Sequence, residues 1–140
     1  MSLPPTNSKL IKFSGFYNLI MAHLIPIPAL QALFGIELPL VGSTLISILL
    51  IYTAAMLIIS SQDIRRYRRV ILFEALLRFG GAFIFITAFT FSDDYGSLML
   101  LAGITDAIWG ICYCFIVPSA VDQSISDILL GKGDESLSYS

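Results

Sequence analysis

The chain has 140 residues, of which 56% are hydrophobic and only 13% are charged. Soluble domains carry about 25% charged residues, so this composition is typical of an integral membrane protein. The formal net charge of −2 argues against the clustered basic surface that a nucleic-acid-binding protein needs.

Four apolar segments follow one another along the chain, and each is long enough to cross a membrane. Each has about 22 residues, which is ~33 Å as an α-helix and matches a hydrocarbon core of ~30 Å. Continuous apolar runs of this length exclude barrel strands, which alternate apolar and polar residues. The connecting loops are short, so we predict an all-α, up-and-down bundle of four transmembrane helices at residues 13–34, 40–61, 70–91 and 96–117.

Charged residues outside these segments predict the orientation of the bundle. Basic residues precede the first segment and fill the loop between the second and third, whereas the other two loops carry only acidic residues. By the positive-inside rule, both termini are cytoplasmic (N-in/C-in), with a lead at 1–12 and a tail at 118–140. A contact with anionic lipid is the alternative explanation of the basic loop. The basic residues are Lys9, Lys12, Arg65, Arg66, Arg68, Arg69 and Lys132.

The first segment contains Pro26 and Pro28 in its outer half. Proline lacks a backbone N–H and clashes with the preceding turn, so two prolines this close together should kink or unwind the helix. Two interpretations stay open. Either the irregular backbone forms one wall of a pocket beside His23, or it is a kink that improves packing.

The tail and the small residues predict two further features. Ser124 and Asp127 fit a capping box, and Gly131 can end the short helix that follows, which we expect at the membrane interface. Small residues in the later segments allow close helix packing within the bundle or, alternatively, in a homo-oligomer. They are Ser43, Ser47, Gly80, Gly81, Ala82, Ala102, Gly103 and Gly110.

Four ionisable residues lie inside the apolar segments: His23, Glu74, Arg78 and Asp106. A charge in hydrocarbon costs at least ~2.5–3.5 kcal/mol, so such residues usually face the bundle interior and have partners. Glu74 and Arg78 are four residues apart, in the order that favours a helical ion pair. Either this pair is purely structural, or Arg78 binds an anionic substrate group while Glu74 tunes it.

His23 and Asp106 lie at similar depths, ~15–17 Å from the cytoplasmic boundary. This match predicts that His23 is a general base held by Asp106. The alternative is that Asp106 only pairs with Arg78 or with His23. Asp106, Trp109 and Tyr113 share one stripe of the fourth segment, where the aromatic rings would line a pocket.

Polar side chains gather in the cytoplasmic half of every segment. Asn18 and Tyr52 supply them in the first two segments, at ~8 Å and ~14 Å from the boundary. The outer halves carry few comparable groups. We therefore expect a cavity that opens towards the cytoplasm or the inner leaflet.

The overall layout resembles the DoxX-like group of small bacterial membrane proteins. The shared features are four short spans, a proline run in the first, a basic inner loop and the stretch Glu-Ala-Leu-Leu-Arg from Glu74 to Arg78, over residues 13–117. The resemblance implies a four-helix bundle in a bacterial cytoplasmic membrane. It carries over no catalytic residues, because the group is functionally mixed.

Together these patterns predict a small membrane enzyme that isomerises or cyclises a lipophilic substrate by acid–base chemistry. The alternatives are a non-catalytic subunit or lipid- or quinone-binding protein, and a small proton-coupled transporter. We expect the bilayer and a lipophilic molecule as partners, with no nucleic acid, metal or cofactor. The expected catalytic residues are His23, Glu74 and Asp106, and the expected substrate-binding residues are Asn18, Tyr52, Arg78, Trp109 and Tyr113.

Overall fold

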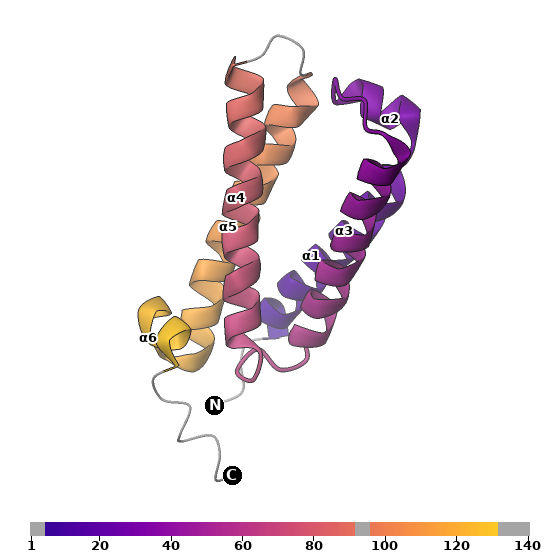
Figure 1. Cartoon of the computed structure of the whole chain (residues 1–140). Helices are drawn as coiled ribbons and strands as arrows, with labels where there is room; N and C mark the ends of the chain where they lie inside the picture. The colour runs from indigo at the N-terminus through magenta and orange to yellow at the C-terminus, as the bar shows by residue number, and fades with distance from the viewer. Residues whose placement is uncertain (1–4, 92–95, 132–140) are drawn as a thin grey trace.

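The computed structural model describes residues 5–91 and 96–131, and this part of the chain is helical without strands. This part has four long helices and two short ones. The long helices run in alternating directions, with the short ones at their ends (Figure 1). The helices are α1 (Pro5–Leu24), α2 (Pro28–Leu33), α3 (Leu40–Ser60), α4 (Arg68–Phe91), α5 (Ser97–Val121) and α6 (Ile125–Leu130).

Three of these helices are long and apolar enough to cross a membrane. They are α3 with 21 residues, α4 with 24 and α5 with 25. They match the predicted segments 40–61, 70–91 and 96–117 to within four residues at each end. Only 28% to 33% of the most apolar part of each helix is buried, so most of these apolar side chains face outward. Such a surface suits hydrocarbon and would be an aggregation liability in water.

Exposed hydroxyl groups on these helices are satisfied by their own backbone. Thr44 donates to the Leu40 carbonyl at 2.7 Å, and Ser119 donates to the Phe115 carbonyl at 2.7 Å. Because both bonds stay within one helix, neither hydroxyl needs water. This is the arrangement that a lipid-facing surface requires.

The prediction of one helix over residues 13–34 is wrong. The helix α1 ends at Leu24, and α2 begins at Pro28. Pro26 disfavours helical backbone at the residue before it, and its missing N–H removes a hydrogen bond from the preceding turn. Pro28 occupies the first turn of α2, where no N–H is needed. The two prolines therefore break the helix instead of bending it. At the other end, α1 starts at Pro5, within the predicted lead.

The helices pack as two pairs, α1 with α3 and α4 with α5 (Figure 1). Glycines allow the close approach in both pairs. A Cβ added at Gly15 would lie 3.0 Å from the Ala54 carbonyl oxygen, and one added at Gly110 would lie 2.9 Å from the Phe79 ring. The predicted packing role of Gly110 is thus confirmed.

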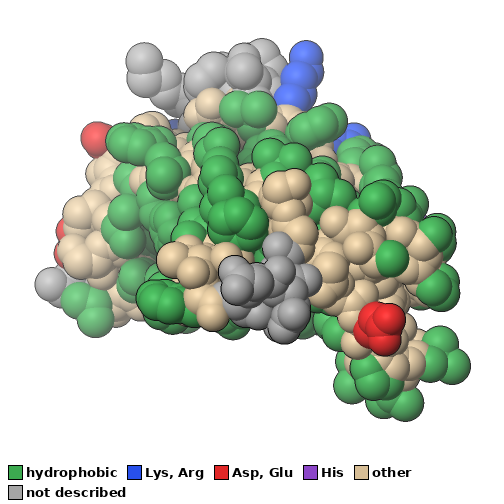
Figure 2. All heavy atoms as spheres, turned by 90° about the horizontal axis from the view of Figure 1, so that it is seen from above, with side chains coloured by type: hydrophobic (Ala, Val, Ile, Leu, Met, Phe, Trp, Pro, Cys, Tyr) green, Lys and Arg blue, Asp and Glu red, His purple; other side chains and the backbone are tan. Residues whose placement is uncertain are grey.

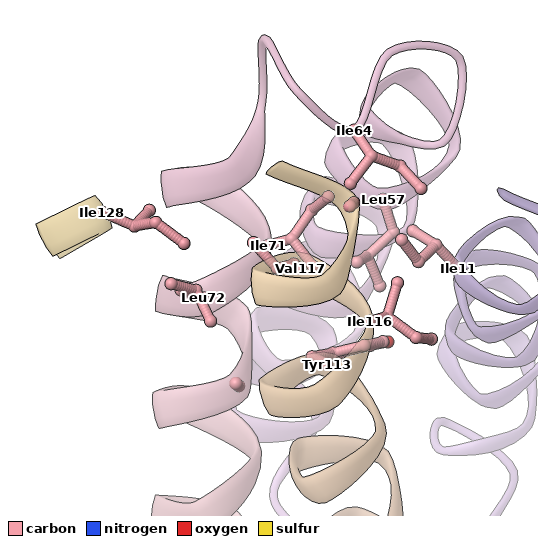
Figure 3. Packing of buried hydrophobic residues seen from close by; sticks show 11 residues of the cluster. Ile11, Leu57, Ile64, Ile71, Leu72, Tyr113, Ile116, Val117 and Ile128 are labelled. Atoms are coloured by element: carbon pink, nitrogen blue, oxygen red, sulfur yellow. The ribbon is translucent and has the colours of Figure 1, made fainter. Parts of the chain in front are cut away.

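The two pairs meet at the end of the molecule that holds residues 61–69 and α6, here called the arginine end. Apolar side chains from both pairs converge there into one core (Figure 3). Tyr113, Ile71 and Ile11 are fully buried in it. The predicted short helix, α6, is capped by the Ser124 hydroxyl, which accepts from the Asp127 N–H at 3.1 Å.

Arginine side chains at the same end donate hydrogen bonds to the backbone of α5 and α6. Arg65 Nε donates to the Ala120 carbonyl at 3.3 Å, and Arg69 Nε donates to the Ile128 carbonyl at 3.0 Å. At the opposite end, here called the far end, the Gly96 N–H donates to the Phe34 carbonyl at 3.2 Å. Figure 2 looks onto the far end, where hydrophobic side chains are spread among areas of backbone and other side chains. The two pairs are therefore joined at both ends.

Candidate functional site

Arg78 is the centre of a buried polar cluster in the arginine half of the bundle. Its side chain is only 7% exposed, although it lies in one of the three apolar helices. Nη1 donates to Asp106 Oδ1 at 2.6 Å, and Nη2 donates to Asn18 Oδ1. Nε lies 3.5 Å from Glu74 Oε1, which confirms the predicted ion pair. The guanidinium thus joins α1, α4 and α5.

Asn18 extends this cluster to α3. Its Nδ2 donates to Thr53 Oγ1 at 2.9 Å, and its side chain also interacts with the Glu74 carboxylate. Thr53 in turn donates to the Leu50 carbonyl at 3.2 Å. We call Asn18, Thr53, Glu74, Arg78 and Asp106 the Arg78 cluster. All four long helices contribute to it, as we expect from the polar side chains in one half of every predicted segment.

A second buried polar pair adjoins the Arg78 cluster. The Tyr113 hydroxyl donates to Ser14 Oγ, and both residues are fully buried. The Tyr113 hydroxyl also interacts with the Arg78 guanidinium. Trp109 is half-buried beside this pair, with its ring centroid 6.2 Å from Tyr113 and 6.1 Å from Phe13. The stripe of Asp106, Trp109 and Tyr113 therefore does lie at one site.

Gly81 is what allows Asp106 to reach this position. A Cβ added at Gly81 would lie 2.8 Å from Asp106 Oδ2, closer than carbon and oxygen atoms approach without repulsion. The neighbouring Gly80 faces open space. The absence of a side chain at Gly81 thus leaves room for the carboxylate against α4.

The charges of the cluster do not cancel. Two carboxylates, Glu74 and Asp106, face a single guanidinium, Arg78, so the ionised groups sum to −1. Within the described residues, Arg78 Nε has no hydrogen-bond partner, so the contact with Glu74 is electrostatic only. Buried charges are costly unless each is paired and hydrogen-bonded. One bound proton on the carboxylates would bring the cluster to neutrality.

The structure does not bring His23 to this cluster. His23 is exposed near the end of α1, and its Nδ1 bonds with the Leu19 carbonyl of the same helix at 2.7 Å. Asp106 instead pairs with Arg78. The predicted His23–Asp106 dyad is therefore wrong. Equal depth places two residues at one level but does not place them on facing sides of their helices.

Tyr52 is also outside the cluster. Its side chain is on the outer surface of α3 and the residue is 61% exposed, so the prediction that it shapes the cavity is wrong. The next residue, Thr53, is 6% exposed and faces the cluster in its place. One step along an α-helix turns a side chain by about 100°, which is enough to exchange lipid for the bundle interior.

Sequence reasoning also missed Ser14. A signal for it exists, because Ser14, Asn18 and Ala22 recur every four residues and are all buried. This spacing marks the inward stripe of α1 and excludes His23 from it. Two cavities, of about 340 and 120 Å³, lie around α2 at the far end, and neither is lined by a residue of the Arg78 cluster.

Comparisons of this chain with models of known protein families, with curated proteins and with solved structures find no match. The resemblance to DoxX-like proteins therefore stays an expectation from layout alone.

Proposed function

We propose that the protein is a small integral membrane enzyme that isomerises or cyclises a lipophilic substrate by acid–base chemistry at the Arg78 cluster. One observation carries the proposal: two carboxylates inside the bundle, the buried Glu74 and the partly buried Asp106, share a single guanidinium. One of them can exchange a proton while the other balances the charge of Arg78. A buried network with equal numbers of positive and negative charges would be explained by a structural role alone.

The geometry divides the roles between the two carboxylates. Asp106 makes the short 2.6 Å bond to Arg78 and is the more accessible, with 17% of its side chain exposed. Glu74 is 9% exposed and lies at the longer distance of 3.5 Å. We assign the transferable proton to this pair, which takes it from one carbon of the substrate and returns it to another. Such a step conserves atoms and electrons and needs no co-reactant.

Arg78 positions both carboxylates, and the half-buried ring of Trp109, which packs beside the fully buried Tyr113, provides the apolar contact. His23 has no part in this proposal, because it is exposed and bonded to its own helix.

The membrane topology belongs to the same proposal. We propose that residues 13–34, although broken, make a fourth crossing. Ser14 touches Tyr113 in the arginine half, and Phe34 touches Gly96 at the far end. The segment therefore covers the same length of the bundle as most of α5. We propose that the arginine end is cytoplasmic in a bacterial membrane, as the positive-inside rule favours.

Solvent deuterium uptake tests the function without knowledge of the substrate. A carboxylate that returns an exchanged proton to carbon will introduce deuterium from D₂O into a membrane lipid. Membranes containing the wild-type chain should yield a deuterated lipophilic species by mass spectrometry, and membranes with Asp106→Asn or Glu74→Gln should not. Asp122→Asn is the matched control. Asp122 is an exposed carboxylate outside the bundle with φ 57°, a conformation that Asn also adopts.

Identical deuterium patterns in wild-type, Asp106→Asn and empty membranes would defeat the enzymatic proposal. The second candidate would then stand, a non-catalytic lipid- or quinone-binding subunit. It is favoured by one observation, namely that the hydrogen bonds of Arg78 to Asp106 and Asn18 are all internal to the bundle. If the chain instead moved protons across the membrane of sealed vesicles without introducing deuterium into any lipid, it would be a proton-coupled transporter.

A further inference from the structure

The break between α1 and α2 creates a cavity at the far end. Its volume is about 340 Å³, within the ~300–1,000 Å³ range of small-molecule sites. Pro26 and Pro28 form part of its wall. The two prolines thus line a cavity, but it is not the predicted pocket beside His23, because His23 is not among the lining residues.

Gln31 holds this cavity in shape. The residue is only 7% exposed, and its side chain links the break before α2 to the loop after α2. Nε2 donates to the Ile25 carbonyl at 2.9 Å, and Oε1 accepts from the Leu38 N–H at 3.0 Å. The cavity is therefore braced by hydrogen bonds across the loop and does not depend on apolar contacts alone. Ser43, 2% exposed, adds a second buried polar group to the lining.

The chemistry of the lining favours a cation. The prolines offer no N–H, and the only charged group among the described lining residues is the exposed carboxylate of Glu37. No Lys or Arg occurs at residues 13–64 or 79–131, which include every described residue of the far end. The remaining lining is mostly apolar, and an apolar cavity of about 120 Å³ borders the first at Gln31 and Ile36. A positive head on an alkyl chain fits this combination.

We propose that the far-end cavity binds the ammonium head of a lipophilic cation, with Glu37 as its counter-ion and the adjoining apolar cavity taking the start of the alkyl chain. The site is separate from the Arg78 cluster and does not depend on the proposed enzymatic activity. It uses the proline break, which the acid–base proposal leaves without a role.

Binding of dodecylammonium to the full chain tests this inference. The chain is placed in phosphatidylcholine nanodiscs, and tritiated dodecylamine is measured by scintillation proximity at neutral pH. We expect saturable binding that unlabelled dodecylamine displaces and dodecanol does not, because dodecanol has the same chain without the charge. Glu37→Gln should weaken binding about threefold to fivefold, as loss of a partly exposed ion pair does.

Two variants make the result specific to the cavity. Ala32, an exposed lining residue on α2, can be replaced by Phe to fill the space, and this should abolish saturable binding while the helical content stays unchanged. Asp122→Asn removes a carboxylate at the other end and should bind as the wild type does. Non-saturable binding, equal displacement by dodecanol, or equal affinity of Glu37→Gln and wild type would each overturn the proposal. These results are independent of the deuterium assay, so the cation-binding proposal and the enzymatic proposal can fail separately.

Discussion

Replacing Gly81 by alanine tests whether the Arg78–Asp106 bond stabilises the bundle. An added Cβ would lie 2.8 Å from Asp106 Oδ2, so the carboxylate must retreat by about 0.6 Å to reach an ordinary 3.4 Å contact. That movement strains or breaks the 2.6 Å bond from Arg78 Nη1. A hydrogen bond to a charged group is worth about 1.5–3 kcal/mol.

Gly80→Ala is the matched control, because a Cβ at Gly80 meets nothing within 4 Å. Both substitutions gain about 1 kcal/mol of helix propensity, so this contribution cancels between them. We therefore expect Gly81→Ala to be less stable than Gly80→Ala by about 1.5–3 kcal/mol, the loss of the charged bond. The assay is equilibrium unfolding in mixed micelles, followed by circular dichroism.

A double-mutant cycle separates this bond from general crowding. In an Arg78→Met background the charged bond is absent while the Asp106 carboxylate remains, so Gly81→Ala and Gly80→Ala should have equal effects if only the bond matters. Equal stability of the two alanine variants in the wild-type background would refute the assigned geometry. A persistent difference in the Arg78→Met background would show that crowding of Asp106, and not the charged bond, is responsible.

Three further substitutions have defined outcomes. Arg78→Met should destabilise the bundle by about 3–5 kcal/mol because it leaves the buried Glu74 and the partly buried Asp106 carboxylates unpaired, and unfolding in mixed micelles measures this. Gly15→Ala should cost about 1–3 kcal/mol and separate α1 from α3, since the added Cβ meets backbone; hydrogen exchange of α1 should rise. Tyr113→Phe should cost about 1–3 kcal/mol by leaving the Ser14 hydroxyl unpaired, and adding Ser14→Ala should recover part of that loss in the same unfolding assay.

The long helices could be predicted from the sequence because a long apolar run in lipid has few alternatives to helical structure. The bounds of α3, α4 and α5 agree with the predicted segments to within a few residues. The prolines predict a disturbed helix at residues 25–27, but not whether the helix bends or ends there. That outcome depends on which groups replace the hydrogen bonds that the prolines remove. Here the Gln31 side chain bonds to Ile25 and Leu38 and stabilises the broken form.

The candidate site could be predicted only where partners lie on one helix. The Glu74–Arg78 pair follows from spacing alone. To predict contacts between helices, one must know how each helix is rotated about its own axis. Helices with apolar residues on all sides give little information about that angle. The sequence pattern therefore predicts Tyr52 at the cluster, whereas the structure places the neighbouring Thr53 there. His23 was assigned by depth, whereas the stripe of Ser14, Asn18 and Ala22 identifies the inward face.

Infrared difference spectroscopy of the carboxyl groups tests the surplus proton in the Arg78 cluster most directly. The wild-type chain in lipid at neutral pH should show the carbonyl stretch of one protonated carboxyl, which shifts on transfer to D₂O. Glu74→Gln and Asp106→Asn should each remove this band, because a single remaining carboxylate is balanced by Arg78. Asp122→Asn should leave the band intact. A wild-type spectrum without a protonated carboxyl, or a band that survives both cluster substitutions, would contradict the account.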